Sequence, residues 1–166
     1  INASVYVFHD IVKLLNNWMF VQTSPADPAV RSVTLSEQYK LDGIKYVIRH
    51  EIGHCLGFMH NFGASSSIPV ESLRSSSFTK KYGTTYSIMD YARFNYVAQP
   101  GDKAKGVQMS PPTFGLYDYY ITKFSYQWFD PKEVPMAKEE EILAKMVSEK
   151  AGDKRYRYGA QGKGID

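Results

Sequence analysis

The chain has 166 residues, of which 43% are hydrophobic and 14% aromatic, enough to bury the core of one folded domain. Its formal net charge is only +3, and no block of lysine and arginine forms the basic surface of a nucleic-acid-binding protein. No apolar run reaches the ~18 residues of a membrane span. The single cysteine excludes an internal disulfide. Composition therefore favours a folded domain, and argues against nucleic acid as a partner and against a membrane-spanning segment.

The N-terminal sequence predicts a strand followed by a helix. Residues 3–8, ASVYVF, are β-branched and aromatic and suit one short strand. Residues 11–19 carry apolar side chains at helical spacing, with Asp10 as a plausible cap and Ser24-Pro25 as the end. The chain starts inside the expected strand and ends in a basic, glycine-rich tail. We therefore expect it to be an interior piece of a longer protein.

A second helix is predicted from about Asp42 to Leu56, and it carries the most informative run of the chain. Residues 50–60 read HEIGHCLGFMH, which fits H-E-x-x-H-x-x-G-x-x-H at every specified position. Residues four apart share one face of a helix, so His50 and His54 can present two imidazoles to the same ion.

Gly57 explains how a third imidazole could reach that ion. A helix continued to position 60 would turn His60 away, whereas glycine can take a positive φ, end the helix and return the chain. Three histidines leave one position open, as in catalytic zinc sites, while structural sites have a fourth protein ligand. Cys55 is interpreted as a small buried apolar residue, because as a nucleophile it would share the ligands' helix and lack an independent base.

Glu51 stands next to the first histidine and can act without binding the metal. Zinc held by three neutral imidazoles would make water a usable nucleophile at neutral pH. The carboxylate of Glu51 would then serve as general base toward water and as general acid toward the leaving amine. A purely structural zinc site has no need of a carboxylate at this position.

Downstream, residues 63–86 are rich in serine, glycine and threonine and predict a long loop, which we expect to form a wall of the substrate pocket. Residues 87–91 read SIMDY, the pattern of the Met-turn that accompanies the long zinc motif. With this pattern the chain resembles the metzincin clan of zinc endopeptidases. The run from Pro69 to Asp102 is more narrowly similar to large bacterial secreted or envelope metzincin-like proteases that carry HExGHxLGxxHNF.

The resemblance is strongest from Leu41 to Asp102 and implies an α+β fold. A mainly helical core with a zinc helix and a Met-turn would be accompanied by a small β-sheet that is incomplete here. Met89 would lie beneath the metal as an apolar floor, and Tyr91 would contact the zinc or the oxyanion of the reaction. A packed or hydrogen-bonded tyrosine is the alternative for Tyr91. The resemblance also implies an extracytoplasmic location.

The C-terminal part predicts two further helices. Ser110-Pro111 would open the first, and Pro135 would open the second, which Gly152 would end. We therefore divide the chain into a metzincin-like catalytic core at residues 1–130, with a truncated sheet, and a C-terminal helix with a basic glycine-rich tail at residues 131–166.

Three carboxylates are candidates for orienting the ligand imidazoles, and the sequence does not choose among them: Asp90, Asp102 and Asp118. The leading hypothesis is a zinc-dependent endopeptidase acting on peptides or proteins. The alternative is a non-catalytic, zinc-stabilised binding or assembly module of a larger protein. An unpaired strand at residues 3–8 would also promote self-association.

Overall fold

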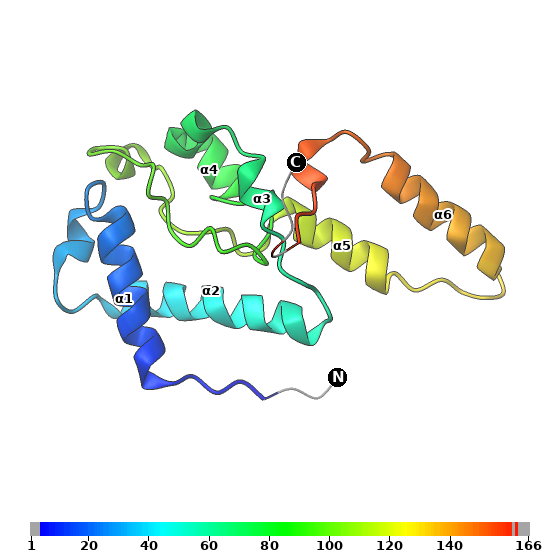
Figure 1. The fold of residues 1–166 in the computed structure, drawn as a ribbon, viewed down its shortest axis with the longest axis horizontal. Coiled ribbons are helices and arrows are strands. Elements are labelled where there is room, and N and C mark those ends of the chain that lie inside the picture. Colours follow the sequence, from blue (N-terminus) through cyan, green and yellow to red (C-terminus); the bar gives the residue numbers. More distant parts are fainter. Residues whose placement is uncertain (1–3, 161, 163–166) are drawn as a thin grey trace.

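The computed structural model describes residues 4–160 and residue 162, and within them every regular element is a helix (Figure 1). The α-helices are α1 (His9–Thr23), α2 (Glu37–Cys55), α3 (Gly63–Ser66), α4 (Ser76–Tyr82), α5 (Leu116–Tyr126) and α6 (Met136–Ser148). Short 3-10 helices lie between them: η1 (Pro28–Arg31), η2 (Val70–Arg74), η3 (Lys103–Lys105) and η4 (Lys154–Tyr156).

The expected α+β fold with a small β-sheet is wrong, because the described residues contain no strand. Residues 4–8 of the predicted strand have no regular structure, and Ala3 lies outside the described residues. A strand is stabilised by hydrogen bonds to a neighbouring strand, which the described part of the chain does not supply. Residues 4–8 instead run alongside α2 (Figure 1).

The main core lies where α1 packs across α2. Its buried side chains come from α1, from η1 and the residues after it, and from the segment after residue 90: Leu15, Met19, Val30, Leu35 and Phe94. Gly43 on α2 permits the close approach, since a Cβ there would lie 3.1 Å from Leu15 Cδ1. Burial of each such apolar side chain stabilises the fold by about 1.5–3 kcal/mol, so this cluster fixes the position of α2.

The predicted long loop at residues 63–86 is also wrong, since α3, η2 and α4 occupy most of it. The apolar residues spaced along it form a second core around the buried Ala64, Ile68 and Tyr86. Ser75 caps α4 by accepting a hydrogen bond from the Phe78 amide at 3.3 Å. Ser75 therefore begins a helix in a segment whose polar composition indicated a loop.

In the C-terminal part, Ser110-Pro111 does not begin a helix, and α5 starts at Leu116. The predicted start of the last helix is confirmed, because α6 follows Pro135 directly, but the helix ends at Ser148 and not at Gly152. No residue of α6 is buried, and Figure 1 places this helix away from α1 and α2. Tyr126 at the end of α5 donates a hydrogen bond to the Leu56 carbonyl at 2.6 Å, which joins α5 to the end of α2. Across the described residues, none of the helices combines the length and the apolar character needed to cross a membrane.

Candidate metal centre

Helix α2 ends at Cys55, one residue after His54, the second histidine of the motif. Gly57 has a φ of +84°. Its amide donates to the His54 carbonyl at 2.9 Å, and the Phe58 amide donates to the Gly53 carbonyl at 3.0 Å. These two bonds form a Schellman helix end. Nothing lies within 4 Å of a Cβ built on Gly57, so its backbone conformation, and not a lack of space, requires glycine.

The three histidines converge on one point. His50, His54 and His60 each offer a ring nitrogen, and these atoms lie within 4.8 Å of one another. The Nε2 atoms of His54 and His60 are 3.1 Å apart. A tetrahedral zinc ion with bonds of about 2.0–2.1 Å separates two ligand nitrogens by about 3.3 Å. The arrangement therefore fits one shared metal ion.

Backbone carbonyls set the orientation of two of these rings. His50 Nδ1 lies 2.7 Å from the Ile88 carbonyl oxygen, and His54 Nδ1 lies 2.8 Å from that of Phe58. A carbonyl oxygen only accepts hydrogen bonds, so the proton belongs on Nδ1 and the lone pair of Nε2 is left for a metal. Burial lowers the pKa of His50, and the neighbouring His54 and His60 act in the same direction. A lowered pKa favours the neutral ring, which is the form that binds a metal.

Met89 lies against α2 between the first two histidines. It belongs to a turn of residues 87–90, in which the Asp90 amide donates to the Ser87 carbonyl at 3.3 Å. Met89 is 2% exposed. A Cβ built on Gly53 would stand 2.3 Å from the Met89 sulfur, closer than real Cβ atoms come. Glycine at position 53 is thus what allows Met89 to pack closely against α2.

A buried carboxylate at the start of α5 holds this turn. Asp118 accepts hydrogen bonds from the Ser87 hydroxyl at 2.6 Å, the Ile88 amide at 2.9 Å and the Gly115 amide at 2.6 Å. Burial raises the pKa of Asp118, and the three hydrogen bonds oppose that rise. Because the Ile88 carbonyl contacts His50, Asp118 positions a ligand ring through one intervening residue.

The other two candidate carboxylates serve different parts of the fold. Asp90 accepts from the Ser65 amide at 2.7 Å and so joins the turn to α3. Asp102 pairs with Arg74 at 2.7 Å, in the segment that follows the turn. Neither carboxylate has a hydrogen bond to His50 or His54 among those described here.

Asn61, which is not among the predicted site residues, ties the third histidine to two other segments. Its side chain is fully buried, donates to the Arg157 carbonyl at 3.0 Å and accepts from the Gly159 amide at 2.9 Å. Its backbone amide donates to the Met89 carbonyl at 2.9 Å. The residue after His60 is therefore fixed both to the turn and to the C-terminal segment. In the sequence, the one signal that could have identified Asn61 is its position directly after His60.

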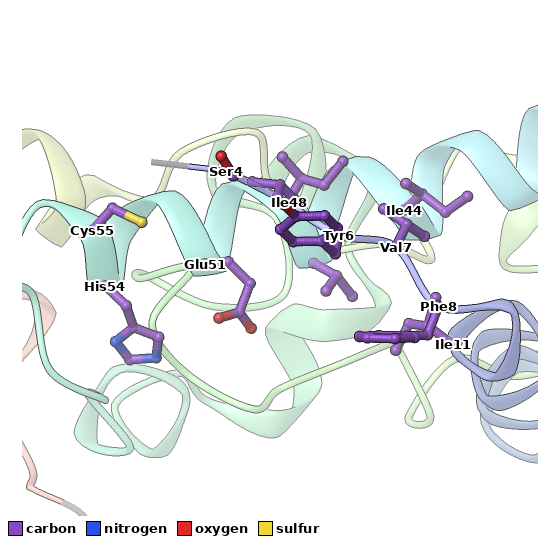
Figure 2. A pocket seen from close by; sticks show the side chains of 12 residues that line it. Ser4, Tyr6, Val7, Phe8, Ile11, Ile44, Ile48, Glu51, His54 and Cys55 are labelled. Carbon is purple, nitrogen blue, oxygen red and sulfur yellow. The ribbon is translucent and has the colours of Figure 1, made fainter. Parts of the chain in front are cut away.

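Glu51 is exposed and opens onto an apolar groove of about 620 Å³. Figure 2 shows Glu51 and His54 pointing from the same side of α2. The groove runs between residues 4–8 and the face of α2 that carries Ile44 and Ile48. No residue of the predicted loop wall at 63–86 lines this groove. Residues 4–8 take that place, because they lie over the apolar face of α2.

Two further predicted residues border the site. Tyr91 is half exposed, and its ring centroid lies 4.6 Å from that of His60 and 5.4 Å from that of His50. The prediction that Cys55 is buried is wrong, since it is exposed and lines the groove. Cys55 sits in the last turn of α2, where that helix extends beyond its packing partner α1 (Figure 1).

Comparison with known proteins places this geometry in a family. A family model described as Met-zincin matches residues 32–166, which include the three histidines, Glu51 and Met89. No curated protein and no solved structure matches the chain. The family match covers most of the chain and confirms the metzincin-clan resemblance. The chain belongs to the Met-zincin family.

Proposed function

We propose that this chain is a zinc-dependent endopeptidase that hydrolyses peptide bonds in peptides or proteins. The observation that carries the proposal is the position of Glu51. Its carboxylate is exposed, adjacent in sequence to His50, and lines a groove together with His54. A metal site that only stabilised the fold would need neither the carboxylate nor the opening.

His50, His54 and His60 would hold the ion through the ring nitrogens that converge there. Zinc bound there would bring the pKa of water to about 7 and polarise a peptide carbonyl. Glu51 accepts a proton from the attacking water, whose oxygen bonds to the carbonyl carbon. As the C–N bond breaks, Glu51 passes that proton to the leaving amine.

The residues around this centre have supporting roles in the proposal. The half-exposed hydroxyl of Tyr91 would donate a hydrogen bond to the oxyanion. The turn at residues 87–90 would act as the Met-turn, with Met89 as the floor. The apolar groove would hold substrate side chains, and the protein would act outside the cytoplasm. The exposed apolar side chains of residues 4–8 would also support association with a second copy.

The test compares Glu51→Gln with the parent protein. Glutamine keeps the size of the side chain but cannot carry the proton, so cleavage of an unfolded protein substrate should fall by about 10³-fold or more. Zinc content, measured by elemental analysis, should stay equimolar in this variant and be lost in His54→Ala. The matched control is Glu141→Gln on the exposed face of α6, which should cleave at the parent rate.

Two outcomes would contradict the proposal. A Glu51→Gln protein that cleaved near the parent rate would remove Glu51 from the mechanism. A parent protein with equimolar zinc, and with stability that a chelator lowers, but without cleavage would support the non-catalytic module instead.

A further inference from the structure

A second cavity adjoins Glu51 and shares Ile11, Val47 and Glu51 with the apolar groove. It has a volume of about 160 Å³ and is lined by Trp18 and Arg93 together with His50, Glu51 and Tyr91. Pockets for drug-sized ligands have about 300–1,000 Å³, so this cavity suits a single side chain. Its position beside the proposed proton carrier makes it a subsite for a residue next to the cleaved bond.

Arg93 is held in this cavity by a backbone conformation that it adopts at a cost. Its φ is +52°, and within the described part of the chain Arg93 is the one residue other than glycine with a positive φ. The left-handed region is unfavourable for a residue that carries a Cβ. The flanking residues hold it there, because the Phe94 amide donates to Gln22 at 3.2 Å and the Asp90 carbonyl accepts from Tyr46 at 3.0 Å. Such strain concentrates at functional positions.

The guanidinium of Arg93 lies over the ring of Trp18, with its central carbon 4.3 Å from the ring centroid. It takes part in none of the ion pairs formed among the described residues. Arg74 and Arg155, by contrast, pair with Asp102 and Asp153. Arg93 is therefore a positioned cation whose fork of N–H donors remains available to a carboxylate.

We propose, on the basis of the proposed peptidase function, that Arg93 is a specificity-determining residue that binds an acidic substrate side chain beside the scissile bond. Glutamate fits better than aspartate, because Ile11, Trp18 and Val47 give the cavity apolar walls for its methylene groups. Glu51 borders the same cavity and repels a second carboxylate. The substrate carboxylate therefore lies at the Trp18 end, where Arg93 is held.

The test uses pairs of quenched fluorescent peptides that carry glutamate or glutamine at successive positions around the cleaved bond. A charge-assisted hydrogen bond contributes about 1.5–3 kcal/mol, so at one position kcat/KM should favour glutamate by about 10-fold or more. In Arg93→Asn this ratio should fall to about 1, since asparagine tolerates a positive φ but carries no charge. Arg93→Lys should restore part of it. Arg31→Asn, which removes an exposed arginine elsewhere, should keep it.

A binding measurement separates this proposal from the peptidase function. In a Glu51→Gln, Trp128→Phe background, Trp18 is the sole tryptophan and reports binding by its fluorescence. Glutamate peptides should bind about 10-fold more tightly than glutamine peptides, and only while Arg93 is present. If the parent cleaves nothing but this difference holds, the peptidase function fails and the acidic subsite stands. Equal binding of both peptides, or a preference that survives Arg93→Asn, would overturn the subsite.

Discussion

Two segments border the C-terminal half of α2, and they differ in almost every physical respect. The turn at residues 87–90 is between 0% and 4% exposed and is hydrogen-bonded to α2, α3 and α5. Residues 5–8, which form the outer wall of the groove, are between 46% and 79% exposed. The side that holds the ligands is fixed from several directions, whereas the side that would meet a substrate is free to adapt. The fold therefore constrains the histidine cluster more tightly than it constrains the groove.

The largest effect is expected when the Asp118 carboxylate that holds the turn is removed. Asp118→Ala should lower the free energy of unfolding by about 4–5 kcal/mol, because three buried donors lose their acceptor. It should also weaken zinc binding by about 10–100-fold through Ile88 and His50. Chemical denaturation and titration against a fluorescent chelator measure the two effects.

Asp118→Asn is the matched control for that prediction. Its oxygen can still accept from the Ile88 and Gly115 amides, and its amide group can donate to the Ser87 hydroxyl. This variant should therefore lose much less unfolding free energy and much less zinc affinity than Asp118→Ala. An Asn variant as impaired as the Ala variant would show that the charge, and not the hydrogen bonds, holds the turn.

The next largest effect is expected at Asn61. Asn61→Ala leaves the Gly159 amide and the Arg157 carbonyl without their buried partner, which should cost about 2–4 kcal/mol of unfolding free energy. Zinc affinity should fall by about 10-fold, because His60 directly precedes this anchor. Asn61→Asp keeps the acceptor for Gly159 but buries a charge against the Arg157 carbonyl oxygen, so it should lose at least as much stability. Unchanged zinc affinity in the Ala variant would separate the C-terminal segment from the site.

On the exposed wall, the effect should be on turnover and not on stability. Phe8→Ala removes a side chain that is 77% exposed, so unfolding should change by less than about 0.5 kcal/mol. The same change removes apolar surface from the groove and should lower kcat/KM by up to about 10-fold. A loss of stability comparable to that of Asn61→Ala would mean that residues 4–8 are part of the fold and not an adaptable wall.

The smallest effect concerns an ion pair that belongs to neither segment. The hydrogen bond from Arg74 lowers the pKa of Asp102 to about 2. The unfolded value is near ~3.9, so the pair stabilises the fold above about pH 4, and this contribution is lost as the pH falls toward about 2. The difference in unfolding free energy between the parent and Asp102→Asn should shrink over that interval. A difference that stayed constant would show that the pair does not act through this charge.

The clustering of the three histidines could be predicted from sequence because its geometry is local. The helical spacing of His50 and His54, and the glycine before His60, place three rings within one short run. Asp118 and Asn61 could not be assigned in the same way. The side chain of Asn61 bonds to Arg157, 96 residues away, and that of Asp118 bonds to Ser87, 31 residues away, and only folding brings those segments together.

The fold class could not be predicted because composition does not specify a partner. Residues 4–8 have the side chains of a strand, but hydrogen bonds to a second strand decide whether one forms. The same limit applies to residues 63–86, whose serines indicated a loop. There the apolar residues Ile68, Leu73 and Phe78 meet Tyr86 in a core, and this packing stabilises short helices that propensity alone would not support.

The exposed position of α6 makes residues 130–150 a modular part of the chain. Tyr126 is tied to the end of α2 and Tyr120 contacts Tyr156, so both ends of the intervening stretch are anchored to the body. A connection with fixed ends can change length cheaply, because doubling a flexible loop costs only about 0.6 kcal/mol. Residues 130–150 are therefore the place to graft a reporter domain or an affinity handle while the histidine cluster keeps its shape.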